Sequence, residues 1–129
     1  MTIDKAILVL VLMILGHLLA DYPLQGWLAQ AKAKSYWKNA LEKNKKDYIA
    51  ALVGHSTMWG IITFIPVIYF SWNELGWLWL LLPVNIIIHC LIDNLKTNLN
   101  SINLIQDQLF HITQVNVTWI LWIVFTTLE

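Results

Sequence analysis

The sequence contains no arginine and a single cysteine, and each of these absences excludes a class of site. Without arginine there is no guanidinium fork for bidentate binding of phosphate or carboxylate. With Cys90 alone, no internal disulfide can form. A glycine-rich phosphate loop, a Gly-x-Ser-x-Gly nucleophile elbow and a Cys-x-x-Cys pair are also missing. The formal net charge is zero, so overall charge gives no reason to expect binding to nucleic acid.

Apolar side chains are abundant instead, at 58% of the 129 residues, and the mean hydropathy is +0.61. A soluble domain of this size has too much surface for its volume to bury that much apolar area. Lipid is the solvent that suits the excess. We therefore expect an integral membrane protein with a single transmembrane domain, residues 1–129.

Four long stretches with few charges predict four transmembrane helices, at about residues 4–24, 48–72, 75–96 and 107–128. A bilayer core of ~30 Å needs about 20 helical residues to cross it. The first stretch reaches that length only if Asp21 lies within the membrane boundary. The predicted fold is thus all-α, an up-and-down bundle of four transmembrane helices.

The lysines lie mainly on one side of this predicted bundle. Six of the eight follow the first span, Lys96 lies at the connection between the third and fourth spans, and the other side has only Lys5. By the positive-inside rule, both lysine-bearing connections are cytoplasmic and both chain ends lie outside. Apolar residues such as Trp27, Trp37 and Leu41 suggest a short interfacial helix between the first two spans, although a solvated basic loop fits equally well.

Each predicted span contains one histidine. The four are His17, His55, His89 and His111. They lie near the end of the first span, the start of the second, the end of the third and the start of the fourth. An up-and-down topology therefore places all four at the cytoplasmic ends of their helices, at a shared depth.

Three of these histidines have an aspartate four residues away. The pairs are His17 with Asp21, His89 with Asp93, and His111 with Asp107. A spacing of four puts both side chains on one face of a helix. Ionisable groups at the edge of the hydrocarbon are costly unless they are paired, hydrated or bound to an ion. Seven of them at one depth therefore indicate a site rather than packing.

Imidazole and carboxylate groups are ligands for Zn²⁺, Fe²⁺ and Mn²⁺. The candidate metal ligands are His17, Asp21, His55, His89, Asp93, Asp107 and His111. The set exceeds the three or four ligands of one catalytic zinc, so it leaves room for a second ion, a general base or carboxylates that orient histidines. Asp21 or Asp107 could act as the base on an activated water. Gln25, Gln108 and Lys96 could bind a substrate, and Lys96 favours an anionic one.

This set of groups predicts a metal-dependent membrane hydrolase that acts on a lipid-like or membrane-delivered substrate. Three alternatives remain. The polar lines could carry ions or protons, a histidine pair could bind b-type haem, or the cluster could only fix helix pairing. The short spans are also compatible with a homodimer.

The motifs come in a recognisable order. They are Gly16-His17-Leu-Leu-Ala-Asp21-Tyr-Pro-Leu-Gln25, His55, His89-Cys-Leu-Ile-Asp93-Asn-Leu-Lys96 and Asp107-Gln108-Leu-Phe-His111. Over nearly the whole chain this order resembles the small membrane family known as domain of unknown function 3307, of bacteria and their phages. The resemblance implies the bacterial cytoplasmic membrane and a site on the motif residues, but no established activity. The family often has a lysine some way after the first block, a place that Lys32 or Lys34 could fill. The arrangement is similar, more distantly, to membrane-bound metal-dependent hydrolases.

Overall fold

A computed structural model describes residues 2–72 and 76–128 of the chain. The predicted start of the third span, Leu75, lies outside the described residues. Helices account for all the regular structure in the described part. In order, the elements are α1 (Ile3–Asp21), α2 (Leu28–Ala31), the 3₁₀ turns η1 (Lys34–Trp37) and η2 (Glu42–Asn44), α3 (Asp47–Phe70), the 3₁₀ turn η3 (Gly76–Leu80), α4 (Leu81–Thr97) and α5 (Leu104–Leu128). The prediction of an all-α chain with four long helices is confirmed.

Four helical stretches are long and apolar enough to cross a membrane. They are Ile3–Asp21, Glu42–Phe70, Leu78–Thr97 and Leu104–Thr127. Two boundaries differ from the prediction for identifiable reasons. The first helix ends at Asp21 rather than near residue 24, because Pro23 restricts the residue before it and cannot continue the hydrogen-bond ladder.

The last helix begins three residues before the predicted start at residue 107. Asn103 and Gln106 explain the difference, because they form a reciprocal cap. The Gln106 backbone N–H donates to Asn103 Oδ1 at 2.9 Å, and the Asn103 N–H donates to Gln106 Oε1 at 3.0 Å. Such a capping box satisfies two backbone donors that a helix start leaves free.

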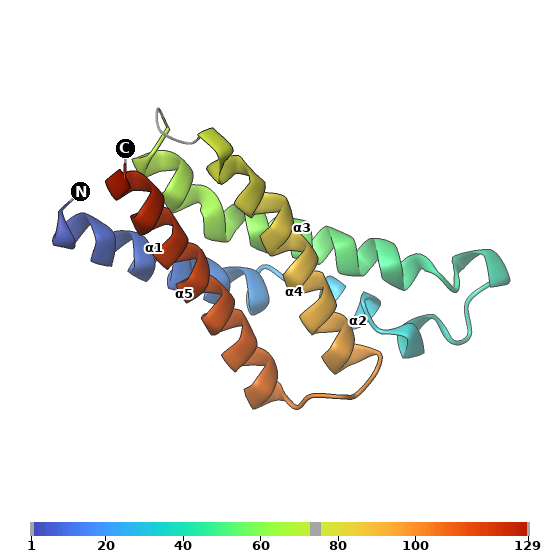
Figure 1. The fold of residues 1–129 in the computed structure, drawn as a ribbon. Helices are drawn as coiled ribbons and strands as arrows, with labels where there is room; N and C mark the ends of the chain where they lie inside the picture. Colours follow the sequence, from blue (N-terminus) through green and yellow to red (C-terminus); the bar gives the residue numbers. More distant parts are fainter. Residues whose placement is uncertain (1, 73–75, 129) are drawn as a thin grey trace.

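The four long helices alternate in direction, and both chain ends lie at the end of the bundle that also holds the α3–α4 connection (Figure 1). Helix α1 packs against α3 and α5, and α4 packs against the same two helices. The bundle interior away from the polar residues is filled by apolar side chains. They include Val9, Met13, Trp59, Phe64, Val67, Val115 and Trp122.

Glycines allow α3 to approach both of its neighbours closely. A Cβ atom at Gly16 of α1 would lie 3.1 Å from the backbone oxygen of Ile62 in α3. A Cβ atom at Gly60 of α3 would lie 2.5 Å from Ile86 Cγ1 in α4. Because Gly16 directly precedes His17, the close contact of α1 with α3 sets how far the His17 side chain reaches into the bundle.

The lysine-rich segment between α1 and α3 contains a shorter helix than its apolar residues suggest. Helix α2 covers only Leu28–Ala31, and Ala33 then adopts an extended conformation (φ −91°, ψ 131°) that stops the helix. Asn98 at the end of α4 fixes this segment: its Oδ1 accepts from the Lys34 N–H at 2.7 Å, and its Nδ2 donates to the Lys32 carbonyl at 3.1 Å. The segment is thereby tied to the end of α4 that bears Asp93.

Candidate metal centre

All seven candidate ligands come together inside the bundle, at the end that carries the lysine-rich segment. Helix α1 provides His17 and Asp21, α3 provides His55, α4 provides His89 and Asp93, and α5 provides Asp107 and His111. All four histidines are fully buried, and the three aspartate side chains are at most 5% exposed. The three His/Asp pairs, each on its own helix, thus join His55 of α3 in one cluster that spans four helices.

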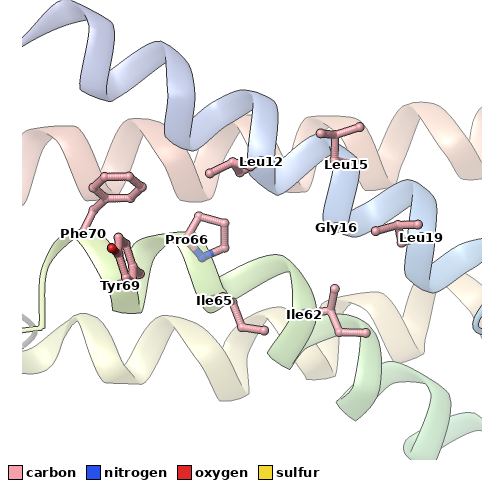
Figure 2. A pocket seen from close by; sticks show the side chains of 9 residues that line it. All are labelled: Leu12, Leu15, Gly16, Leu19, Ile62, Ile65, Pro66, Tyr69 and Phe70. Atoms are coloured by element: carbon pink, nitrogen blue, oxygen red, sulfur yellow. The ribbon is translucent and has the colours of Figure 1, made fainter.

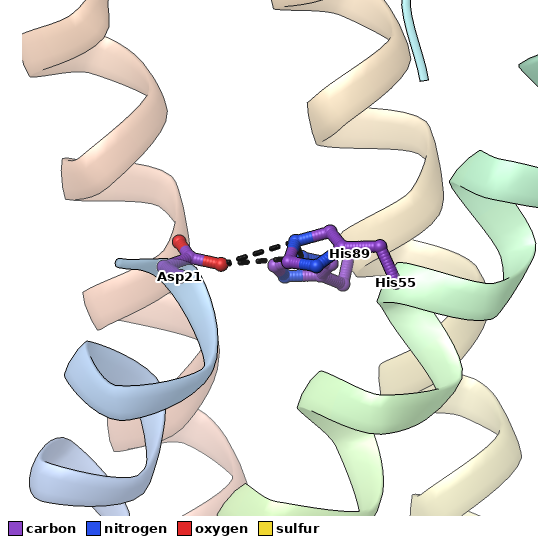
Figure 3. Close-up of side chains that lie close together, drawn as sticks. All are labelled: Asp21, His55 and His89. Atoms are coloured by element: carbon purple, nitrogen blue, oxygen red, sulfur yellow. Dashed lines mark hydrogen bonds and ion pairs between the residues drawn. The ribbon is translucent and has the colours of Figure 1, made fainter. Parts of the chain in front are cut away.

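Four donor atoms in this cluster lie close together. His55 Nε2 lies 3.2 Å from Asp21 Oδ1, 3.4 Å from Asp93 Oδ2 and 3.2 Å from His89 Nε2. His89 Nε2 lies 3.7 Å from the same two oxygens. Figure 3 shows Asp21 reaching from α1 towards the rings of His55 and His89. Around an ion with bonds of ~2.0–2.2 Å, tetrahedral ligands are about 3.3–3.6 Å apart. These five separations lie close to that range, although Asp93 does not belong to the group of Asp21, His55 and His89 whose ligand atoms all lie within 4.8 Å of one another.

A second group of donors lies beside the first. His111 Nε2 lies 3.5 Å from Asp93 Oδ1 and 3.4 Å from Asp107 Oδ1. The His111 and His89 rings stack with their centroids 4.1 Å apart, and the Trp59 ring stacks on His89 at 4.2 Å and lies 5.9 Å from His111. Donor atoms of His89, Asp93 and His111 lie within 4.8 Å of one another, as do those of Asp21, His55 and His89. Either group of three could hold an ion.

Several of these candidate ligand atoms are buried and have no hydrogen-bond partner among the described residues. They include Asp21 Oδ1, Asp107 Oδ1 and His111 Nε2. The distance of 3.4 Å between Asp107 Oδ1 and His111 Nε2 is therefore a contact without hydrogen-bond alignment. A buried polar atom without a partner costs about 1–3 kcal/mol. His55 Nε2 and His89 Nε2 lie at hydrogen-bond distance from each other, but Asp21 Oδ1, Asp107 Oδ1 and His111 Nε2 remain without a partner, and such buried ligand atoms fit a divalent ion.

His17 lies at the edge of the cluster and differs from the other histidines. The indole Nε1 of Trp59 donates to His17 Nδ1 at 2.9 Å, and Asp21 Oδ2 lies 3.6 Å from the same nitrogen. This hydrogen bond occupies the lone pair that Nδ1 would give to a metal. Sequence reasoning missed Trp59, although it lies four residues after His55 and so shares its helix face. The role of His17 as a ligand stays a prediction.

Two lysines pair with the aspartates. Lys32 Nζ lies 2.6 Å from Asp93 Oδ2, with the lysine only 6% exposed, and Lys96 Nζ lies 2.6 Å from Asp107 Oδ2. Lys34 instead lies over the ring of Tyr48, 5.2 Å from its centroid. Of the two lysines that could follow the first motif, Lys32 is therefore the one at the site. With neutral histidines, three carboxylates and two ammonium groups leave one net negative charge, which favours a cation.

The candidate polar residues around the cluster have different partners. Gln108 Nε2 donates to Asp107 Oδ2 at 3.1 Å and to Asp21 Oδ2 at 3.4 Å, so it joins two of the carboxylates. Gln25 Nε2 donates to the backbone oxygen of Asp21 at 2.6 Å and closes the end of α1. Ser56 donates to the backbone oxygen of Leu52 within its own helix.

A polar cavity of about 180 Å³ adjoins the cluster. It is lined by Asp21, Tyr22, Gln25, Ala29, Lys32, Asp93, Lys96, Thr97, Leu104, Asp107 and Gln108. Tyr22 and Leu104 are more than half exposed, so the cavity reaches the surface of the bundle. Three carboxylates, both lysines and both glutamines thus face one space that a small molecule could enter from outside.

The family model described as "Protein of unknown function (DUF3307)" matches residues 9–129. The chain belongs to this family. The matched range contains all seven cluster residues together with Lys32 and Lys96. No curated protein and no solved structure matches the chain. The family description names no activity.

A larger hollow on the outside of the bundle has the opposite character. It measures about 440 Å³ and lies between α1 and α3 (Figure 2). Its walls are Leu12, Leu15, Gly16, Leu19, Ile62, Ile65, Pro66, Tyr69 and Phe70. None of these side chains is charged or belongs to the cluster. The aspartates of the cluster instead line the smaller, polar cavity.

Proposed function

We propose that this family member is a metal-dependent membrane hydrolase that acts on an anionic, lipid-like or membrane-delivered substrate. One observation carries the proposal: in a buried place, His55 Nε2 of α3 and His89 Nε2 of α4 each lie 3.2–3.7 Å from carboxylate oxygens of Asp21 and Asp93, and Asp21 Oδ1 has no hydrogen-bond partner among the described residues. Polar contacts between membrane helices average under ~1 kcal/mol. So large a cluster would therefore be a costly way to specify helix pairing alone.

The proposed location is the bacterial cytoplasmic membrane, with the cluster at its cytoplasmic face. Four helices are long and apolar enough to cross a bilayer. The lysines gather at the end of the bundle where the cluster and its cavity lie, and this asymmetry supports a cytoplasmic position for that end. Both chain ends would then lie outside.

The proposed centre holds zinc, iron or manganese on Asp21, His55, His89 and Asp93. A divalent ion there would supply Lewis-acid chemistry to a hydrolytic reaction. Asp107 has one oxygen held by Lys96 and Gln108, which leaves its Oδ1 available to accept a proton or to bind an ion. The Trp59 ring stacks on His89 and would shield that ligand from water.

The cavity suggests the class of substrate. Its volume of about 180 Å³ is below the ~300–1,000 Å³ typical of sites that enclose drug-sized ligands. A head group fits this space, whereas an acyl chain would have to remain in the bilayer. Lys32 and Lys96 line the cavity and favour an anionic group such as a phosphate ester.

A second candidate, an ion or proton pathway, is favoured by polar residues that lie deeper in the bundle. Gln114 Nε2 and Thr118 Oγ1 both donate to Asn85 Oδ1, each at 2.9 Å. Asn85 lies one turn from His89, so polar groups continue beyond the cluster. The same bundle also buries large apolar side chains such as Phe64 and Trp122, which favours a site entered from one face over a complete pathway.

The distances between the histidine rings argue against haem binding, one of the alternatives that the sequence leaves open. The ring centroids of His55 and His89 lie 5.1 Å apart, and those of His89 and His111 lie 4.1 Å apart. A porphyrin between two axial histidines needs more space than either pair provides. A visible absorption spectrum of the purified protein is expected to lack a Soret band.

A hydrolysis assay on the metal-loaded protein tests the proposal. The protein in mixed micelles would be stripped, reloaded with zinc, iron or manganese, and given long-chain forms of a phosphomonoester, a phosphodiester and a carboxylic ester. We expect metal-dependent cleavage of a phosphate ester that is lost in His89→Ala and kept in Asp4→Asn, a matched substitution at an exposed aspartate outside the cluster. Metal-loaded protein that cleaves none of the three would contradict a hydrolase and favour the ion pathway.

A further inference from the structure

The two oxygens of the Asp93 carboxylate face different histidines. Oδ2 lies 3.4 Å from His55 Nε2 and 3.7 Å from His89 Nε2, whereas Oδ1 lies 3.5 Å from His111 Nε2. Asp93 is only 2% exposed. It therefore stands between the two groups of donors, with one oxygen directed at each.

The side chains around Asp93 Oδ1 have the properties expected of ligands to a second ion. His111 is fully buried and Asp107 is 1% exposed, yet His111 Nε2 and Asp107 Oδ1 have no hydrogen-bond partner among the described residues. The other oxygen of Asp107 accepts from Lys96 at 2.6 Å and from Gln108 at 3.1 Å. These two donors hold the carboxylate so that Oδ1 lies 3.4 Å from His111 Nε2.

We propose that the cluster binds two divalent ions that share the Asp93 carboxylate, an inference that rests on the metal centre of the proposed function. Asp21, His55, His89 and Asp93 Oδ2 hold the first ion. Asp93 Oδ1, Asp107 and His111 hold the second. Paired ions in hydrolytic sites lie ~3.5–4 Å apart, and the stacked His89 and His111 rings, with centroids 4.1 Å apart, keep their ligand atoms within 4.8 Å of each other.

The two positions differ in how many protein ligands they offer. The first has four, whereas the second has three, as in catalytic sites that keep a position open. Asp93 and Asp107 both line the polar cavity, so the open position faces the space through which a substrate arrives.

The net charge of the cluster also favours an anionic substrate. The carboxylates and lysines of the cluster leave one net negative charge when the histidines are neutral. Two divalent ions would turn this into three net positive charges in a buried place, where uncompensated charge is costly. Anionic ligands would compensate that charge, and a phosphate group is the class that fits both the charge and the small cavity.

Metal analysis combined with electron paramagnetic resonance tests the second position. Full-length protein in detergent would be loaded with Mn²⁺, and metal per chain and the spectrum would be measured for the wild type, His111→Ala, Asp107→Asn and Asp4→Asn. We expect two ions and a spin-coupled spectrum in the wild type and in Asp4→Asn. His111→Ala and Asp107→Asn should each retain one ion with the spectrum of isolated Mn²⁺.

Other results would contradict the inference in distinguishable ways. One ion in the wild type that is unchanged in Asp107→Asn, which keeps the shape of the side chain, would overturn the second position and leave the first intact. Two ions without spin coupling would overturn the shared carboxylate. No ion in any of the proteins would overturn both the inference and the metal centre. Two coupled ions without hydrolysis would leave this inference standing and contradict only the proposed activity.

Discussion

Lys32 and Asp93, 61 positions apart in the sequence, form a buried ion pair in which Lys32 Nζ lies 2.6 Å from Asp93 Oδ2. The same oxygen faces His55 and His89, where the proposed first ion would lie. The ammonium group therefore balances the carboxylate in the metal-free protein. A metal ion would compete with it for the same oxygen.

This competition predicts that Lys32→Met makes the protein depend on metal for its stability. Removing one partner of a buried ion pair costs about 3–5 kcal/mol because the other charge is left uncompensated. We expect a large loss of thermal stability in chelator, and recovery of most of it when zinc is added. Lys34→Met is the matched control, because the Lys34 side chain is exposed and lies over Tyr48. An equal loss with and without zinc would contradict the competition.

His17 and His55 should respond differently to substitution. Trp59 already donates to His17 Nδ1, whereas His55 Nε2 faces two carboxylate oxygens at 3.2 and 3.4 Å. His17→Gln should therefore lower stability by about 1 kcal/mol, the order of a lost interhelical hydrogen bond in a membrane, and leave zinc affinity within a few-fold of wild type. His55→Gln should weaken zinc binding at least tenfold, as measured by competition with a chromogenic chelator. Equal losses of affinity would place His17 among the ligands.

Gly16 should be far less tolerant of a side chain than Gly54. A Cβ atom at Gly16 would lie 3.1 Å from the Ile62 oxygen and 3.3 Å from Thr63 Cα, both on the backbone of α3, whereas no atom lies within 4 Å of a Cβ atom at Gly54. Gly16→Leu should separate α1 from α3, and the protein should unfold at a lower SDS fraction and lose metal. Gly54→Ala should be neutral or stabilising by up to ~1 kcal/mol, from helix propensity. Equal behaviour of the two variants would contradict the close contact.

The proposed orientation predicts which surface residues a membrane-impermeant thiol reagent can reach. In a Cys90→Ala background, Lys43→Cys should be labelled in inverted vesicles and protected in intact cells. Asp4→Cys should show the reverse pattern, since Asp4 lies in the first turn of α1, and α1 begins at the other end of the bundle. Labelling of Lys43→Cys in intact cells would overturn the orientation and with it the cytoplasmic position of the site.

Patterns within single helices were readable from the sequence. Histidine and aspartate four residues apart must share a helix face, and four alternating helices bring such faces to one end. The gathering of His17, His89 and His111 with their aspartates follows from these two rules. The Asn103-x-x-Gln106 cap was also readable in principle, although the last helix was predicted to begin later.

Contacts between segments were not readable in the same way. Lys32 reaches Asp93 only because Ala33 ends α2 and Asn98 ties the following residues to α4. Trp59 contacts His17 because α1 and α3 approach closely at Gly16. Which oxygen of Asp93 faces which histidine depends on side-chain packing among three helices, and spacing along the chain carries no information about it.

Elemental analysis of the detergent-purified protein, beside His89→Ala and Asp4→Asn, tests the central claim most directly. His89 Nε2 lies 3.7 Å from both carboxylate oxygens of the proposed first position. The proposal predicts zinc, iron or manganese at one or more equivalents per chain in the wild type and in Asp4→Asn, and a clear loss of at least one equivalent in His89→Ala. No metal in any of the three proteins, even after each ion is supplied, would contradict a metal centre and leave a buried polar cluster in its place.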